Sequence, residues 1–351
     1  MMSEIIETSA NIPAVVGVGK TDFGLLSAGN LRRTAREIPH VISWDGAQYL
    51  VGMGVEKFAR PTERMDFLRL ADGKEGQALT LTTLGSLAGE SRQLQASLMV
   101  GFPVEVMLNR SLATQILRDL RAWLTKVHRF TLDGQEYCIT VDDLQAAAQP
   151  AGAYFTWGMN NQGKWNRSAA DLDVLVGIAD IGFNTLDIFS VAGGQVVGKL
   201  TGGDTAGIRR AAEALMREVK EKYDVNLSRH EADQFLRAEK PTLSCWQGEI
   251  DLAPLTSQAI EAAASGIGDF IETLWGPGKQ FRHLLFTGGG AELIRTQLVR
   301  RYPHGQVLPS PVLANALGLA RYGRRVFKTA QNVIGLDPGF GGFKAVRLEA
   351  N

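Results

Sequence analysis

Short apolar runs alternate along this chain with longer amphipathic stretches, and glycine, proline or aspartate bounds most of the apolar runs. Short runs of this kind predict strands, whereas apolar residues spaced by three and four predict helices. The stretch 257–275 has that helical spacing, which predicts one buried face made of Ile260, Ala264, Ile267, Ile271 and Leu274. The alternation of the two patterns indicates an α/β architecture.

The expected elements extend over the whole chain. Its 351 residues suit about two domains at roughly 150 residues each. Strands are expected at Ile12–Val18, Gln48–Met53, Leu98–Phe102, Tyr137–Val141, Val174–Ala179, Thr185–Val191, His283–Thr287 and Val333–Leu348. Helices are expected at Gly76–Leu87, Ser111–Val127, Ala206–Lys222, Arg229–Arg237, Ser257–Trp275, Glu292–Arg301 and Pro311–Arg321.

Charge and composition exclude several classes of partner. Lys and Arg number 37 together, as do Asp and Glu, so no net charge favours direct binding to nucleic acid or to a membrane surface.

The beginning of the chain lacks a basic segment followed by an apolar run, so we expect no signal peptide. Cys138 and Cys245 stand in no metal-ligand spacing and are interpreted as reduced thiols of a cytoplasmic protein.

Two glycine-containing turns follow apolar runs that end in aspartate. The first is Asp180-Ile181-Gly182-Phe183-Asn184-Thr185-Leu186-Asp187. The second is Asp337-Pro338-Gly339-Phe340-Gly341-Gly342-Phe343-Lys344. Tight glycine turns between strands present backbone N–H groups to an anion, and a carboxylate at a strand end can hold hydrated Mg²⁺ through water. A hairpin would fold Lys344 back towards the turn. A plain hairpin with a capping aspartate is the alternative.

A third glycine site lies in Leu285-Phe286-Thr287-Gly288-Gly289-Gly290-Ala291-Glu292-Leu293. Here a strand is expected to run into three glycines and then into a helix. Glycines at such a point let backbone lie flat against a ring or a sugar. A single triple glycine is a weak signal, but three such turns in one α/β chain predict that each contacts a different part of one nucleotide.

These motifs resemble those of the actin/heat-shock chaperone/sugar kinase superfamily. DPGFGGFK resembles its phosphate-1 motif, with the aspartate-to-lysine spacing of actins. DIGFNTLD resembles the phosphate-2 motif of plasmid-segregation actins of the ParM/StbA type, and TGGGAEL resembles the adenosine motif. Residues 149–153 and 314–318 resemble the two segments that connect the domains. The resemblance covers nearly the whole chain.

The resemblance implies a two-domain α/β fold with a nucleotide cleft between the domains. Domain I would comprise 1–153 plus 313–351, and domain II would comprise 154–312. In the family the phosphate-1 strand opens the chain, whereas here it lies at 333–348 and closes it. We therefore expect a circular permutation, natural or engineered, in which Met1 and Asn351 lie close together at a hairpin end of domain I.

The resemblance also implies the roles of individual residues. Asp337 and Asp180 would hold Mg²⁺ through water. The phosphates of ATP or ADP would lie against Gly339, Phe340, Gly341, Gly342, Lys344, Gly182, Phe183, Asn184 and Thr185. The adenosine would lie against Gly288, Gly289 and Gly290. Gln149 would orient the attacking water, with Gln145 as the candidate if the register slips. The alternative for Gln149 is that it only caps a helix.

The leading functional hypothesis is an ATPase that polymerises with itself into cytoskeletal filaments for plasmid or DNA segregation, with a DNA-bound adaptor as a candidate partner. The first alternative is a small-molecule kinase on the same fold, for which Asp142 and Asp143 are candidate bases. The second is a nucleotide-binding assembly protein or chaperone-like regulator without enzymatic activity. The choice between ATP and GTP stays open, as do the contacts to the edge of the base.

Overall fold

The computed structural model describes residues 5–19, 38–62, 67–205 and 207–350. The chain divides into two compact units. Unit 1 comprises Met1–Asn166 and Ala316–Asn351, and unit 2 comprises Arg167–Asn315. Each unit has its own sheet and its own hydrophobic core, so the expected α/β architecture is confirmed. Helix α5 (Gln149–Gly158) lies wholly in unit 1, although the expected boundary at 153 would divide it.

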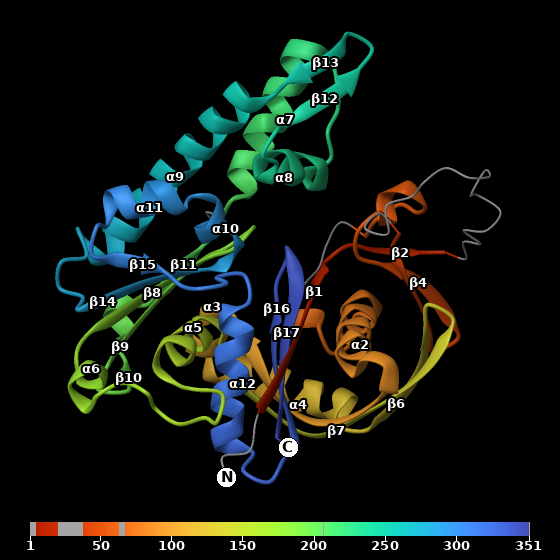
Figure 1. Ribbon diagram of the computed structural model, residues 1–351, viewed down its shortest axis with the longest axis vertical. Helices are drawn as coiled ribbons and strands as arrows, with labels where there is room; N and C mark the ends of the chain where they lie inside the picture. The colour runs from red at the N-terminus through yellow and green to blue at the C-terminus, as the bar shows by residue number, and fades with distance from the viewer. Residues whose placement is uncertain (1–4, 20–37, 63–66, 206, 351) are drawn as a thin grey trace. The chain divides into compact units, whose positions relative to one another are not determined.

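Unit 1 is built on a nine-stranded sheet (Figure 1). In sheet order the strands are β1 (Ile5–Pro13), β17 (Gly342–Ala350), β16 (Asn332–Pro338), β5 (Gln93–Phe102), β7 (Gln135–Ala148), β6 (Val127–Leu132), β3 (His40–Trp44), β4 (Ala47–Val51) and β2 (Val16–Val18). Strands β16, β5 and β7 run parallel, and all other neighbours are antiparallel. Only Ala14 and Val15 separate β1 from β2, although these strands occupy opposite edges. The sheet must therefore curl until its two edges approach each other.

The curled sheet surrounds helix α2 (Lys74–Ala88), as Figure 1 shows. Twelve of its fifteen residues are buried, so this helix lacks the polar face of an ordinary surface helix. Two of its buried hydroxyls bond within the helix: Thr80 donates to the Gly76 carbonyl at 2.8 Å, and Thr83 donates to the Leu79 carbonyl at 2.7 Å. A buried hydroxyl without a partner is costly, and this backbone bonding avoids that cost at Thr80 and Thr83, whereas the buried Thr82 hydroxyl has no partner among the described residues.

The remaining helices of unit 1 differ from the expectation at one point. They are η2 (Val55–Lys57), η3 (Phe67–Arg69), η4 (Gly89–Ser91), α3 (Val104–Leu108), α4 (Arg110–Leu124), α5 and most of α12 (Ala314–Val326). The helix expected to reach Val127 ends at Leu124, and Val127 begins strand β6 instead. The alternating burial along β6 explains this, because His128, Phe130 and Leu132 face the core while Val127 and Arg129 are exposed.

Unit 2 contains a six-stranded sheet and a separate two-stranded hairpin. The sheet consists of β10 (Gln195–Val196), β9 (Leu186–Ala192), β8 (Val176–Ile181), β14 (His283–Thr287) and β15 (Gly305–Val307) in that order, with β11 (Gly202–Asp204) also paired to β9. The hairpin consists of β12 (Thr242–Cys245) and β13 (Gly248–Asp251). The helices are α6 (Ala169–Asp173), η5 (Gly198–Leu200), α7 (Arg209–Tyr223), α8 (Arg229–Arg237), α9 (Ala253–Trp275), α10 (Gly288–Leu293) and α11 (Arg295–Arg301).

Helix α9 presents the face that its sequence predicts. Ala264, Ile267 and Ile271 are buried, and Ile260 and Leu274 pack partly buried against the same cluster. Across the described helices of the chain, none combines the length and the apolar character needed to cross a membrane.

The same arrangement of five strands occurs in both units. Unit 1 has the order β1-β17-β16-β5-β7, and unit 2 has the order β10-β9-β8-β14-β15. In each set the first three strands are antiparallel and the last three are parallel. The chain enters the unit 2 set at β8 and reaches β9 and β10 directly. In unit 1 the corresponding strands β16 and β17 come last, and β1 comes first.

The two ends of the described chain are neighbours in the unit 1 sheet. Strands β1 and β17 pair along their whole length, and Ile5 lies opposite Ala350. Met1 and Asn351, for which proximity was expected, lie outside the described residues. Their nearest described neighbours in sequence therefore belong to adjacent antiparallel strands.

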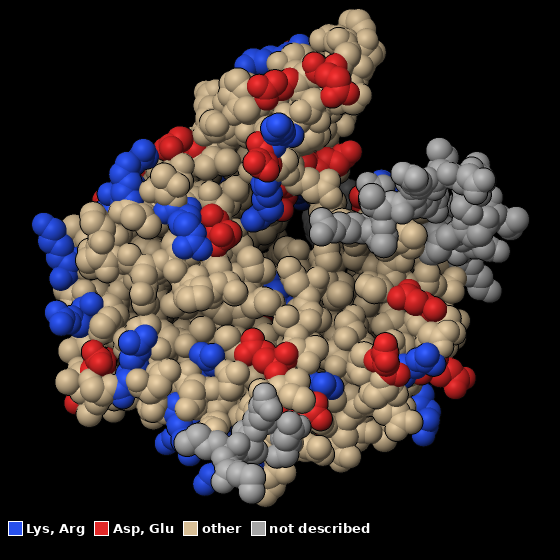
Figure 2. Space-filling view, in the orientation of Figure 1, with Lys and Arg blue, Asp and Glu red and all other residues tan. Residues whose placement is uncertain are grey.

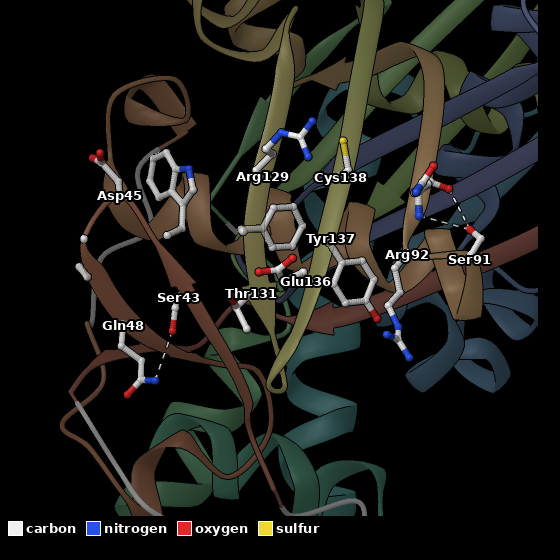
Figure 3. Close-up of a pocket in the computed structure, with 15 residues that line it drawn as sticks. Ser43, Asp45, Gln48, Ser91, Arg92, Arg129, Thr131, Glu136, Tyr137 and Cys138 are labelled. Atoms are coloured by element: carbon white, nitrogen blue, oxygen red, sulfur yellow. Dashed lines mark hydrogen bonds between the residues drawn. The ribbon is translucent and has the colours of Figure 1, made fainter.

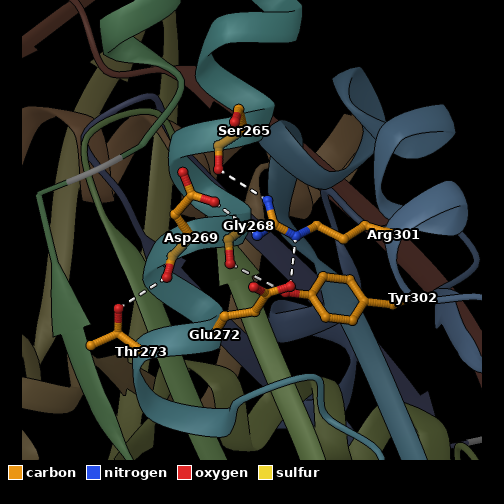
Figure 4. A network of polar contacts seen from close by, with 7 residues as sticks. All are labelled: Ser265, Gly268, Asp269, Glu272, Thr273, Arg301 and Tyr302. Carbon is orange, nitrogen blue, oxygen red and sulfur yellow. Dashed lines mark hydrogen bonds and ion pairs between the residues drawn. The ribbon is translucent and has the colours of Figure 1, made fainter.

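In unit 2 a network of polar contacts around Arg301 links α11 to α9 (Figure 4). The Arg301 guanidinium donates to Glu272 at 2.9 Å, to Asp269 at 2.8 Å and to the Ser265 carbonyl at 3.2 Å. The neighbouring Tyr302 is 1% exposed, and burial raises the pKa of its phenol to about 12. This network fixes the end of α11 beside strand β15, which begins at Gly305.

Unit 1 also depends on close contact between α12 and α5. An added Cβ at Gly318 of α12 would lie 1.7 Å from the carbonyl oxygen of Gly152 in α5. We expect Gly318→Ala to lower the free energy of unfolding by about 3 kcal/mol, because the backbones must separate. Urea unfolding monitored by circular dichroism measures the change. The matched control is Gly266→Ala in α9, where an added Cβ meets nothing within 4 Å and should stabilise the helix by up to about 1 kcal/mol. Equal stability of the two variants would contradict the packing described here.

Candidate nucleotide site

In unit 1 the candidate site is the turn between β16 and β17. The turn is closed by two backbone hydrogen bonds, from Gly339 N to Gly342 O at 3.1 Å and from Gly342 N to Gly339 O at 3.2 Å. Phe340 at its tip is 39% exposed. An added Cβ at Gly339 would lie 3.0 Å from the Lys344 Nζ, so glycine leaves room for that amine. The turn therefore presents backbone and one lysine, as its sequence predicts.

Asp337 and Lys344 face each other across this hairpin. They are register partners in β16 and β17, and the Lys344 Nζ lies 3.8 Å from the Asp337 Oδ2. Asp337 is 4% exposed, whereas the Lys344 side chain is 19% exposed. The seven-residue spacing thus brings a nearly buried carboxylate and a partly exposed amine together at the base of a glycine turn.

Gln149 contacts the same hairpin. Its Nε2 donates a hydrogen bond of 2.8 Å to the carbonyl oxygen of Pro338, and its side chain is buried. The alternative that Gln149 caps a helix is wrong, because Ala148 occupies the N-cap of α5 and no side-chain cap hydrogen bond is present. Gly101 of β5 permits this position, since an added Cβ would lie 2.8 Å from the Gln149 Cγ. Gln145 lies within β7, opposite Met99.

In unit 2 the corresponding turn joins β8 to β9. Gly182 N donates to Thr185 O at 2.9 Å, so Phe183 and Asn184 form the tip. The segment before α7 holds this turn, because Ile208 N donates to Gly182 O at 3.2 Å. An added Cβ at Gly207 would lie 2.3 Å from Phe183 O. Gly207 is thus a requirement of the site that the sequence analysis did not identify.

Asp180 lies inside β8 rather than after its end, and one of its partners is a neutral amide. Asn315 donates from Nδ2 to the Asp180 Oδ2 at 2.7 Å. Asn315 is 3% exposed, and within the described part of the chain its Oδ1 is buried without a hydrogen-bond partner. Gly288 has a positive φ of 88°, and an added Cβ there would lie 2.5 Å from the Asp180 Oδ1. A side chain at position 288 would therefore fill the space beside this carboxylate.

The three glycines differ from the expectation, because they form the first turn of α10 rather than a loop before a helix. The turn is anchored by Pro311, whose carbonyl oxygen accepts from Gly288 N at 2.9 Å and from Thr287 Oγ1 at 3.0 Å. Arg237 of α8 donates from Nη1 to Gly289 O at 2.9 Å. Gly288, Gly289 and Gly290 are thus held from two sides.

Sequence reasoning missed Arg237 and Asn315 as site residues. Arg237 also pairs with Asp233 one helical turn away, at 2.9 Å, so its guanidinium is oriented before it reaches the glycine turn. The only signals in the sequence are an arginine at the end of an expected helix and an asparagine between two alanines, Ala314 and Ala316. Both patterns are common, and neither identifies a contact partner far along the chain.

Hard oxygen donors and glycine turns of this kind fit a hydrated divalent cation and phosphate groups. Asp180 and Asp337 supply the carboxylates, and carboxylate oxygens are the ligands that Mg²⁺ takes from proteins, often through water. The unsatisfied Asn315 Oδ1 and the space that a Cβ at Gly288 would occupy are consistent with a polar ligand beside Asp180. Each unit thus contains part of the set of residues that the sequence predicts to contact one nucleotide.

Two family models match parts of the sequence. The model described as "Actin like proteins N terminal domain" matches residues 2–152. The model described as "Archaeal actin homologue MreB-like, C-terminal" matches residues 178–300. No curated protein sequence matches the chain.

Solved structures share the fold over most of their length. The archaeal actin homologue Ta0583 superposes with a TM-score of 0.66 at 21% identity, covering 90% of this chain and 92% of that chain. A ParM filament from Clostridium botulinum gives 0.69 at 18% identity with 90% and 92% covered. Apo pSK41 ParM gives 0.64 at 16% identity with 90% and 91% covered. Ta0583 has also been solved in complex with ADP. The chain therefore has an actin-like two-domain α/β fold.

Proposed function

We propose that this chain, whose fold is that of the actin-like proteins, binds ATP and hydrolyses it to control its own assembly into filaments. The main support for nucleotide binding is a pair of equivalent hairpins, β16–β17 with Asp337 and β8–β9 with Asp180. Each hairpin combines a carboxylate on its first strand with a glycine turn. Both features suit a phosphate group accompanied by a hydrated cation.

The residues of the two turns have the following proposed roles. Lys344 and the turn 339–342 bind phosphate groups, and so does the turn 182–185. Asp337 and Asp180 orient the water shell of Mg²⁺, which when bound neutralises charge on the transferred phosphoryl group. The turn 288–290, held by Arg237, lies against the adenosine. Gln149, anchored to Pro338, orients the attacking water.

The contacts support hydrolysis over transfer to a metabolite. A small-molecule kinase needs a carboxylate base besides the two that we assign to Mg²⁺, but the further side chain that contacts the Asp337 hairpin is an amide, that of Gln149. Asp142 accepts a hydrogen bond from Gln95 at 2.9 Å, and Asp143 accepts one from the Leu144 backbone at 2.7 Å. Both carboxylates are exposed and engaged in contacts of their own.

We propose that the partner of this chain is another copy of itself, because structures with this fold include a ParM filament and an Alp12 filament. Head-to-tail contact through two different surfaces does not close, and so generates a filament. Figure 2 shows lysine, arginine and acidic side chains interspersed over the visible face, which agrees with their equal numbers. We therefore propose that any role in plasmid or DNA segregation runs through an adaptor in the cytoplasm rather than through direct DNA contact.

We also propose that the chain is circularly permuted relative to its fold relatives. The support is the repeated strand order, which unit 2 runs through as β8, β9 and β10 in succession. The same succession in unit 1 requires β16, β17 and then β1, with Ala350 opposite Ile5. Joining the chain ends through a short turn would restore one continuous three-strand meander.

Replacing either carboxylate tests the nucleotide site. We expect Asp180→Ala and Asp337→Ala each to lower Mg²⁺-dependent ATP hydrolysis by roughly 100-fold or more, because each removes charge beside the phosphates. Phosphate release measures the rate, and thermal melting checks that the variants fold. The matched control is Asp142→Ala, an exposed aspartate outside both hairpins. Turnover at the wild-type rate in either site variant would show that the site is misplaced.

Replacing Gln149 distinguishes two roles for its side chain, which are to orient the attacking water or to support the hairpin. Gln149→Ala should lower kcat by roughly 100-fold while ATP affinity changes little, since orientation of the nucleophile acts mainly in the transition state. Single-turnover kinetics and equilibrium binding measure the two quantities. A collapse of affinity with unchanged turnover of bound ATP would instead assign Gln149 to hairpin support. If Gln145→Ala gives the expected result, the register is wrong.

Measuring assembly in the presence of different nucleotides tests the proposed filament function. The protein at roughly tens of micromolar should pellet and scatter light with a non-hydrolysable ATP analogue, and less so with ADP. A coupling of about 1–3 kcal/mol between nucleotide state and subunit contact would change the affinity roughly 5–150-fold. Electron microscopy identifies the polymer. A protein that stays monomeric with the analogue, or that phosphorylates a metabolite, would refute the cytoskeletal function.

A further inference from the structure

The β12–β13 hairpin exposes a tryptophan at its tip. Trp246 is 82% exposed, the highest value of any large apolar side chain in the described residues. Gly248 has a positive φ of 101°, which permits the tight reversal and leaves Trp246 and Gln247 between the strands. Figure 1 shows the hairpin at the end of unit 2 that lies away from its six-stranded sheet.

The strands behind this tip are anchored, so the tip is presented rather than loose. Leu243 is buried, and Cys245 and Ile250 pack partly buried against the core of unit 2. The indole of Trp246 contacts no other aromatic ring in the described residues. Tryptophan exposed to this extent costs solvation free energy, and tryptophan is the residue most enriched among the anchors of protein interfaces.

Unit 1 contains an open groove that has no part in the candidate nucleotide site. It arises because β3 and β6 pair only at Ile42–Leu132 and Ser43–Thr131 and then diverge. The hairpin between β3 and β4 forms one wall, Ser91–Gln93 forms the other, and strands β6 and β7 form the floor (Figure 3). Its volume of about 1230 Å³ exceeds the roughly 300–1,000 Å³ typical of small-molecule pockets, which favours a protein segment as the occupant.

The chemistry of the groove is complementary to that of the hairpin tip. Arg92 and Arg129 line the groove, are exposed and form no ion pair with any described residue. Of the two acidic residues that line it, Asp45 pairs with Lys74 at 2.5 Å and Glu136 is exposed, so the arginines outnumber the unpaired carboxylate. Arg92 has a left-handed φ of 53°, and its carbonyl accepts from Cys138 N at 2.9 Å, which fixes the residue on the groove wall. Guanidinium groups bind indole faces and carboxylates.

The hairpin carries both of those ligands. Besides Trp246, Glu249 is exposed on the hairpin beside the tip and forms no ion pair among the described residues. We propose that the β12–β13 hairpin of one copy of this chain docks into the β3–β6 groove of the next copy, with Trp246 as its anchor. This contact joins two different surfaces, so it propagates instead of closing. The inference rests on the proposed self-assembly and specifies one contact through which it occurs.

The two native cysteines provide a direct test. Cys245 precedes Trp246, Cys138 lines the groove, and both are free thiols of intermediate exposure. A short bismaleimide added under assembly conditions should link Cys245 of one copy to Cys138 of the next, giving a ladder of dimers, trimers and larger species on a denaturing gel. Cys138→Ser and Cys245→Ser should each abolish the ladder. Mixing these two variants should restore a dimer and nothing larger, because only one productive pair remains.

Substitutions at the contact test its energetics. Trp246→Ala should raise the concentration required for assembly about 30-fold or more, with ATP binding unchanged. The matched control is Val196→Ala, which shortens another exposed apolar residue (52%) in a short hairpin of the same unit. Arg129→Glu should weaken assembly, and combining it with Glu249→Arg should recover part of the loss.

Each outcome separates this interface from the proposed function. Filaments that pellet normally but give neither a ladder nor a mixed dimer would overturn the interface and leave the ATP-driven polymer intact. A dimer formed by Cys138→Ser alone would show a symmetric contact between two hairpins and would also overturn it. A mixed dimer from a protein that never pellets would support the interface while refuting the filament.

Discussion

The insertion of β16 and β17 between β1 and β5 is the constraint on which unit 1 depends. Strand β17 pairs with β1 from Gly342 to Ala350, and β16 supplies the parallel neighbour of β5. Without this hairpin β1 would lose its partner in the sheet, and α2 would lose part of its apolar cover. The hairpin also supplies Asp337, Lys344 and the carbonyl that Gln149 binds. The core and the candidate site of unit 1 are therefore built by the same pairing.

Both units use one backbone arrangement to present different charges. Asp180 and Asp337 occupy equivalent places, each at the base of a four-residue turn. The residue opposite Asp337 is Lys344, whereas the residue opposite Asp180 is Asp187, which is 4% exposed. Asn315 donates a hydrogen bond to Asp180 without cancelling its charge. The unit 1 hairpin thus pairs its carboxylate with a cation, whereas the unit 2 hairpin places two carboxylates opposite each other.

Glycine is required at the points where chain segments meet most closely. Gly335 of β16 approaches α12 so closely that an added Cβ would lie 2.0 Å from the Ala316 carbonyl oxygen. Gly318 makes the equivalent approach to α5, and Gly207 and Gly288 make it beside the unit 2 turn. Backbone packing at this distance leaves no room for a side chain, which couples the site turns to the helices around them.

The sequence by itself determined the local structures and their chemistry. Apolar runs ending in aspartate and glycine predicted both site hairpins, and the spacing from Asp337 to Lys344 predicted that these two residues approach each other. Helical periodicity predicted the buried face of α9. These predictions were possible because strand, turn and helix periods are properties of neighbouring residues. Only the tertiary structure decided that β6 replaces the end of a helix, that α2 is buried on every side and that Arg237 and Asn315 join the site. It also decided that β3 diverges from β6 and opens a groove. These features depend on contacts between residues far apart in the chain. The alternation of apolar and polar residues does not indicate which distant segments pack together.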